Sequence, residues 1–238
     1  MADVKIDASF QNGVATVKYS DDGRKRVKSV SAEAFCNALL TGIQTSKQVT
    51  LNPLGLRVHA TSGDKMIVGY EMPERVGEMP FRMSRDSNDI ERIKSVWPWG
   101  ITFIEFNKTP EGYRWSTFYQ FGLKGAITGI DTQMFVWPGS NVYGGHNCCI
   151  GEINIPKLRD ISQTGGLPFI FYNGVSNRDL QENRFNDFNE GSHKIDTPYK
   201  LYKDVLQVKD GQMPKPFPYN IMISAKTIKS FLEEKGYL

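Results

Sequence analysis

The sequence predicts an α+β protein built on antiparallel β-meanders with flanking helices. Short segments of alternating apolar and polar residues recur along its first half, tight-turn signals separate them, and apolar residues at helical spacing occur near both ends. The chain has 238 residues, 39% of them hydrophobic and 12% aromatic. These values are typical of a globular protein with one main domain and an extension.

The first fifty residues predict a β-meander followed by a helix. Three strands are expected at "VKIDASF", "VATVKYS" and "RKRVKSV", joined by an Asn-Gly pair and by "DDG". Ser31 can cap a following helix whose apolar stripe begins at Phe35. We therefore expect residues 1–50 to form a β-rich extension and residues 51–238 to form the main domain.

A second antiparallel meander is expected from residue 54 onward. Its predicted strands are "LGLRVHA", "KMIVGYEM", "MPFRMS", "GITFIEFN" and "YRWSTFYQFG", with turn signals between neighbours. The segment "SNDIERIKSV" between them is expected to be a short helix or a polar excursion.

After about residue 125 the chain becomes rich in glycine, and Pro138 and Pro156 interrupt regular structure. This pattern predicts a folded irregular segment, and long ordered loops tend to be functional. Residues 157–163 are then expected to form a helical turn, "LPFIFYNGVSN" to pack back on the sheet, and the polar "RDLQENRFNDFNEGSHK" to be exposed.

The last fifteen residues, "SAKTIKSFLEEKGYL", predict a C-terminal helix. Ser224 can cap it, and Gly236 can end it. Its apolar stripe consists of Ile228, Phe231 and Leu232.

Composition and motifs argue against several classes of function. The formal charge is only +3, from 29 basic and 26 acidic residues, which disfavours nucleic-acid binding. No apolar run approaches the roughly 20 residues of a membrane helix, and the start of the chain lacks signal-peptide regions. We therefore expect a cytoplasmic protein that does not bind membranes. Phosphate-loop, GxSxG and HExxH motifs are also missing, and no cofactor is expected.

Two of the three cysteines, Cys148 and Cys149, are adjacent, and the third is Cys36. An odd number argues against a disulfide framework, and adjacent cysteines bond only through a strained ring. A zinc site needs about four ligands at recognisable spacing. Cys148, Cys149 and His146 provide neither a CxxC motif nor a second pair of ligands nearby, so no metal site is expected. Two interpretations are open. Cys149 can be a reactive thiol with His146 as its base or hydrogen-bond donor, or both cysteines can be small buried packing residues.

The loop around these cysteines resembles the active-site segment of ubiquitin-conjugating (E2) enzymes. In that fold a β-meander precedes an irregular segment with His-Pro-Asn, a turn with glycine, and a catalytic cysteine eight residues after the asparagine. Here Asn141 precedes Cys149 by eight residues, and "VYGGHNC" between them supplies the hydrophobic, aromatic and glycine residues. Gly139 and Ser140 replace the His-Pro pair.

The chain is also similar to a bacterial E2-like family, the PRTRC system protein B group or prokaryotic E2 family D, which tends to lack His-Pro as well. The similarity lies in the order of "MIVGYEMPERVGEMPFRM", "GITFIEFNKTPEGYRWSTFYQF", "MFVWPGSNVYGGHNCCIGEINIP" and "PFIFYNGV". It covers roughly residues 60–175 and is sharpest over about twenty residues.

This resemblance implies an E2-like core within residues 51–238. Cys149 takes the place of the thioester-forming cysteine, and Asn141 that of the asparagine linked to oxyanion stabilisation or loop structure. Tyr143, His146 and Gly151 are supporting candidates. Cys148 is expected to occupy an inward-facing apolar position, because consecutive side chains of an extended segment point to opposite sides.

The implied function is acceptance of a ubiquitin-like modifier as a thioester on Cys149, a cysteine-dependent conjugating transferase. The implied partners are a ThiF/E1-type adenylating enzyme, a small ubiquitin-like protein and a JAB-type peptidase. Two alternatives stay open. One is an E2-like binding module without transfer activity, and the other is a phage or mobile-element protein with a structural or host-interaction role.

Overall fold

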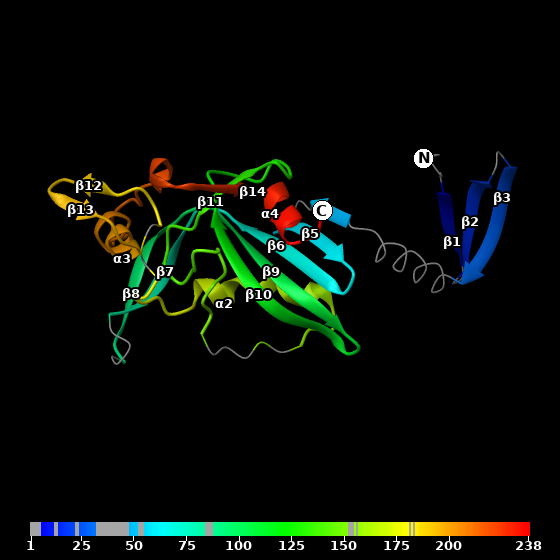
Figure 1. The fold of residues 1–238 in the computed structure, drawn as a ribbon, viewed down its shortest axis with the longest axis horizontal. Coiled ribbons are helices and arrows are strands. Elements are labelled where there is room, and N and C mark those ends of the chain that lie inside the picture. Colours follow the sequence, from blue (N-terminus) through cyan, green and yellow to red (C-terminus); the bar gives the residue numbers. More distant parts are fainter. Residues whose placement is uncertain are drawn as a thin grey trace. The chain divides into compact units, whose positions relative to one another are not determined.

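A computed structural model describes residues 6–11, 14–21, 24–31, 48–51, 55–83, 88–151, 155, 157–180, 182 and 184–238. They form a mixed α+β protein in which the paired strands are antiparallel (Figure 1). The chain divides into two compact units, Met1–Lys47 and Gln48–Leu238. The boundary expected after residue 50 therefore falls inside the first strand of the second unit, Gln48–Leu51.

The first unit contains a three-stranded antiparallel sheet in the order β1-β2-β3. Its strands are β1 (Ile6–Gln11), β2 (Val14–Asp21) and β3 (Arg24–Ser31). Val14 of the central strand pairs with Gln11 on one side and Ser31 on the other. The predicted N-terminal strands are thus confirmed, whereas the helix expected to contain Phe35 and Cys36 lies outside the described residues.

A seven-stranded sheet organises the second unit, with strand order β14-β11-β10-β9-β6-β5-β4. Its strands are β4 (Gln48–Leu51), β5 (Leu56–Ser62), β6 (Lys65–Met72), β9 (Gly100–Thr109), β10 (Gly112–Gly122), β11 (Gln133–Val136) and β14 (Ser224–Thr227). Strands β6 and β9 lie at its centre and are buried on both faces over most of their length. Figure 1 shows the long strands β9 and β10 side by side.

The expected simple meander is wrong at one point, because β6 pairs with β9 rather than with the next strand. The chain between them forms a separate two-stranded ribbon, β7 (Arg75–Arg82) and β8 (Ile90–Trp97). The segment expected to be a helix or polar excursion is therefore the strand β8. Ile93, Ser95 and Trp97 alternate on its buried face, and this period of two outweighs the polar composition.

Short elements complete the second unit. They are η1 (Ile161–Gly166), α2 (Pro168–Tyr172), β12 (Phe188–Glu190), β13 (His193–Ile195), α3 (Pro198–Lys200), η2 (Leu201–Val205), η3 (Tyr219–Ile221) and α4 (Ile228–Glu234). The aromatic segment expected to pack on the sheet is α2, whose Phe171 and Tyr172 are buried beside Trp137. None of the helices in the described ranges is long and apolar enough to cross a membrane.

The C-terminal helix α4 begins later than the sequence suggested. Ser224 lies in β14, and the hydroxyl of Thr227 caps the helix by accepting a hydrogen bond from the Ser230 amide at 3.1 Å. The predicted apolar stripe is confirmed: Ile228, Phe231 and Leu232 are fully buried. Gly236 follows the helix with φ 79°, a left-handed conformation that glycine adopts without steric strain.

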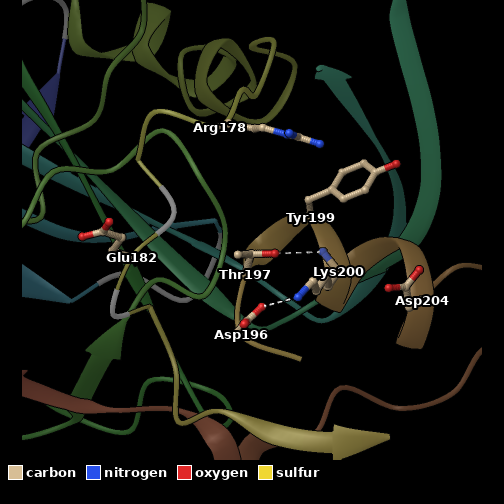
Figure 2. A pocket seen from close by; sticks show the side chains of 7 residues that line it. All are labelled: Arg178, Glu182, Asp196, Thr197, Tyr199, Lys200 and Asp204. Atoms are coloured by element: carbon tan, nitrogen blue, oxygen red, sulfur yellow. Dashed lines mark hydrogen bonds and ion pairs between the residues drawn. The ribbon is translucent and has the colours of Figure 1, made fainter. Parts of the chain in front are cut away.

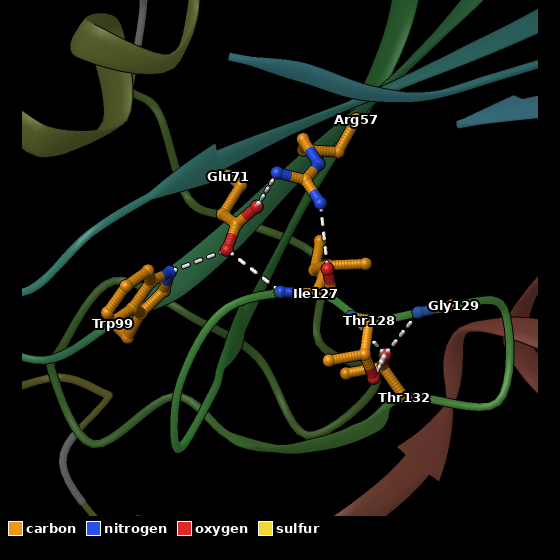
Figure 3. A network of polar contacts seen from close by, with 7 residues as sticks. All are labelled: Arg57, Glu71, Trp99, Ile127, Thr128, Gly129 and Thr132. Atoms are coloured by element: carbon orange, nitrogen blue, oxygen red, sulfur yellow. Dashed lines mark hydrogen bonds and ion pairs between the residues drawn. The ribbon is translucent and has the colours of Figure 1, made fainter. Parts of the chain in front are cut away.

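A buried carboxylate fixes the chain that leads from β10 toward β11 (Figure 3). One oxygen of Glu71 lies 3.0 Å from Nη1 of Arg57, and the other accepts hydrogen bonds from Trp99 Nε1 at 2.8 Å and the Ile127 amide at 2.9 Å. Arg57 also donates to the Ile127 carbonyl at 2.7 Å. The irregular segment after β10 is therefore attached to β5 and β6 at a defined point.

Replacing this carboxylate should destabilise the second unit. In Glu71→Ala the Trp99 indole and the Ile127 amide lose their acceptor, so we expect about 2–4 kcal/mol less free energy of unfolding in urea titrations. Glu78→Ala is the control, because it removes an exposed carboxylate 3.4 Å from Arg92 and should leave the midpoint nearly unchanged. Equal losses in both variants would contradict the role of Glu71.

Candidate functional site

Residues 141–149 form a tight turn with two short antiparallel arms, which we call the cysteine hairpin. The Cys149 amide donates to the Asn141 carbonyl at 2.7 Å, and the Tyr143 amide donates to the Asn147 carbonyl at 2.9 Å. Val142 and Cys148 face each other between these two hydrogen bonds. The two residues that the sequence placed eight apart, Asn141 and Cys149, are therefore brought together across the hairpin.

The second arm of the hairpin extends the main sheet at the edge of β10. The Gln120 amide donates to the His146 carbonyl at 3.0 Å, and the Cys148 amide donates to the Phe118 carbonyl at 2.8 Å. This edge is free for the hairpin because β11 pairs only with the last two residues of β10. The glycine-rich loop is consequently held by backbone hydrogen bonds.

Two buried side chains hold the first arm. Nδ2 of Asn141 donates to the Val175 carbonyl at 3.0 Å, and Nη2 of Arg184 donates to the Val142 carbonyl. Asn141 is buried and has φ 63°, a left-handed conformation that asparagine tolerates better than most residues. The asparagine thus has a conformational role as well as a hydrogen-bonding role.

The two cysteines occupy different environments. Cys148 packs against two hydrophobic clusters, one around Trp97 and one around Phe118, and burial raises the pKa of its thiol well above the ordinary value. The expected packing role of Cys148 agrees with these contacts. Both cysteines are partly exposed free thiols, so they are distinguished by the packing of Cys148 and its raised pKa rather than by exposure. Burial disfavours the thiolate of Cys148, which makes Cys149 the better candidate nucleophile.

His146 is a packing residue. Its ring centroid lies 4.4 Å from that of Phe121, and its Nδ1 is buried without a hydrogen-bond partner. Burial, reinforced by the charges of Lys226 and Arg184, lowers its pKa from 6.5 to about 4. At neutral pH the ring is therefore uncharged and weakly basic, which disfavours the expected role as base or proton donor.

The remaining predicted residues lie on or beside the hairpin. The side chain of Tyr143 is exposed at the turn, and Gly151 is exposed with φ 67° just after the second arm. A Cβ added to Gly139, which stands with Ser140 in the place of the expected His-Pro pair, would lie 2.5 Å from Nε1 of Trp137. The packing of this tryptophan therefore explains why a larger residue is not found there.

The sequence did not indicate a role for Arg184, because the polar segment 178–194 was expected to be exposed. That expectation is wrong at this point, since Arg184 and Phe185 are only 7% and 4% exposed. Phe185 pairs with Met222, and the Asn186 amide donates to the Ile221 carbonyl at 2.8 Å. The two phenylalanines of "NRFNDF" were the available signal that part of this polar stretch packs inward.

A separate pocket of about 620 Å³, lined by polar and charged residues, lies beside α3 (Figure 2). Its lining residues are Arg178, Glu182, Asp196, Thr197, Tyr199, Lys200 and Asp204. Lys200 is held by Asp196 at 2.7 Å and by the helix cap at Thr197. No residue of the cysteine hairpin lines this pocket, and across the described ranges no three His, Cys, Asp or Glu residues are placed to hold a metal ion.

Comparison of the chain with protein-family models, with curated proteins and with solved structures gave no significant match.

His146 should make stability depend on pH. The unfolded chain binds a proton on this residue near pH 6.5 and the folded chain only near pH 4, so stability is lost as pH falls through that window. Thermal unfolding should show a smaller loss between pH 7 and pH 4.5 in His146→Asn, since asparagine also tolerates the left-handed φ of 68°. The exposed His193→Asn is the control, and a pH profile of His146→Asn that matches it would contradict this account.

The two thiols should differ in reactivity. We compare Cys36→Ala/Cys148→Ala with Cys36→Ala/Cys149→Ala, so that each chain retains one hairpin thiol. The thiol of Cys149 should react with N-ethylmaleimide at least about tenfold faster, because burial raises the pKa of Cys148 and so disfavours its thiolate. Intact-mass time courses measure both rates, and urea should equalise them. Equal rates in the folded protein would contradict the assigned environments.

Proposed function

We propose that this protein is an E2-like carrier that accepts a ubiquitin-like modifier as a thioester on Cys149. The observation that carries the proposal is the 2.7 Å hydrogen bond from the Cys149 amide to the Asn141 carbonyl. It joins the two residues whose spacing resembles that of the E2 active site. The partly exposed thiol of Cys149 and the inward packing of Cys148 also support it.

The chemistry requires two acyl transfers. The thiolate of Cys149 attacks the carbonyl carbon of the modifier's C-terminus, which arrives as a thioester on a ThiF/E1-type enzyme. The C–S bond to that enzyme breaks, and its thiolate leaves. An acceptor amine then attacks the new thioester, forms an amide, releases the Cys149 thiolate and gives up a proton to solvent.

The contacts of Asn141 favour the loop-structure role over direct oxyanion stabilisation. Its Nδ2 already donates to the Val175 carbonyl at 3.0 Å, and its backbone carbonyl accepts from Cys149. In this proposal Asn141 holds the nucleophile's arm in place. Tyr143 and Gly151, both exposed beside the thiol's arm, supply surface for the incoming modifier.

The wider proposal assigns residues 51–238 to an E2-like core and residues 1–50 to an interaction extension. An antiparallel sheet that leads into an irregular segment with the cysteine supports this assignment. A cytoplasmic location fits a system that includes a ubiquitin-like protein and a JAB-type peptidase.

One observation favours a second candidate, an E2-like binding module without transfer activity. His146, the nearest histidine in sequence, is neutral at neutral pH and packs on Phe121. Transfer must therefore proceed without an imidazole base from this residue. A module that binds the modifier through the same surface needs none.

A thioester assay separates the two candidates. The protein is mixed with the E1-like and ubiquitin-like proteins encoded by neighbouring genes and ATP, then resolved on a non-reducing gel. We expect a thiol-sensitive adduct on the wild type and on Cys148→Ala, and none on Cys149→Ala, which offers no nucleophilic atom. Binding of the modifier without an adduct would favour the binding module, and an adduct that persists in Cys149→Ala would sink the proposal.

Asn141→Asp tests the loop role in the same assay. The substitution keeps the size of the side chain and tolerance of a positive φ, but the carboxylate cannot donate to the Val175 carbonyl. We expect slower adduct formation, by about five- to tenfold for one lost hydrogen bond. Wild-type rates in this variant would contradict the role assigned to Nδ2.

A further inference from the structure

Arg184 holds the outer edge of the cysteine hairpin, and its environment is unusual for an arginine. Its side chain is buried, its Nη2 donates to the Val142 carbonyl, and its Nε is buried without a hydrogen-bond partner. Burial lowers the pKa of the guanidinium. A buried charge with an unused donor is costly, so the position of this side chain is dictated by something other than its own solvation.

The geometry of the hairpin identifies the Val142 carbonyl as the group that Arg184 serves. Val142 and Cys148 form a non-hydrogen-bonded pair, because the two hydrogen bonds flank them. The backbone groups of Val142 therefore point away from the second arm. Arg184 closes this outer edge with a charge-assisted hydrogen bond, while β10 closes the opposite edge through Cys148.

The backbone that follows Arg184 is itself fixed. Phe185 is buried and pairs with Met222, and the Asn186 amide donates to the Ile221 carbonyl at 2.8 Å. The guanidinium is thus presented from a packed segment rather than from a loose loop. Its charge also helps to keep His146, a residue of the hairpin's turn, neutral.

We propose that Arg184 is a positioning residue for Cys149: by holding the Val142 carbonyl, it keeps the Asn141–Cys149 hydrogen bond in register. Its consequence for modifier transfer rests on the proposed function. Its effect on the conformation of the hairpin does not, and the two can be measured separately.

The test uses Arg184→Met and Arg184→Lys in the full chain. Methionine fills similar space without a buried charge, so Arg184→Met should keep the thermal stability of the wild type. Lysine keeps the positive charge but lacks the planar guanidinium group. We expect the Cys149 amide to exchange with solvent at least about tenfold faster in Arg184→Met, the factor expected for a lost charge-assisted hydrogen bond. Arg184→Lys should restore part of the protection. Arg178→Met replaces an exposed arginine six positions earlier and is the matched control. Its Cys149 amide should exchange at the wild-type rate.

The thioester assay supplies the second readout. Adduct formation at saturating modifier should fall at least about tenfold in Arg184→Met, with partial rescue in Arg184→Lys. If the wild type forms no adduct but Arg184→Met still speeds exchange of the Cys149 amide, the proposed function fails and the positioning role stands. Unchanged exchange in a folded Arg184→Met overturns the inference. If Arg184→Met unfolds, Arg184→Lys decides by the same exchange measurement.

Discussion

The candidate site depends on the edge of β10 that faces away from β9. Three segments share this edge: β11 takes its last two residues, the cysteine hairpin takes the part around Phe118 and Gln120, and Leu158 pairs with Tyr113 further along. Buried backbone groups must find partners, so each segment can occupy only the stretch that the others leave. The position of Cys149 follows from this division of one strand edge.

Buried polar side chains hold the irregular segments of the second unit in place. Glu71 fixes the segment after β10, Asn141 attaches the hairpin to Val175, and Arg184 attaches it to the packed chain near Met222. Hydrogen bonds to backbone atoms offset the desolvation of Glu71 and Asn141, whereas Arg184 makes such a bond but leaves its Nε without a partner. A site built in this way keeps its geometry even though the hairpin consists of only nine residues, 141–149.

Local patterns in the sequence predicted a large part of this architecture. The alternating strands of both units, the buried stripe of α4 and the packing of Cys148 follow from periodicity and from the alternation of side chains. Long-range pairing did not follow, because nothing local indicates that β6 pairs with β9 and that β7 and β8 form a separate ribbon. The buried Arg184 was hidden for the same reason: its acceptor, the Val142 carbonyl, lies 42 residues away in the chain.

The arrangement of the hairpin is tested most directly by proton NMR of the folded protein. Val142 and Cys148 form a non-hydrogen-bonded antiparallel pair, in which the Cα atoms approach to about 4.5 Å and the Hα protons lie in close contact. We predict a strong nuclear Overhauser effect between the Hα protons of Val142 and Cys148, and slow exchange of the Cys149 amide. The absence of this cross-peak, with an amide of Cys149 that exchanges as fast as those of Gly144 and Gly145, would contradict the account.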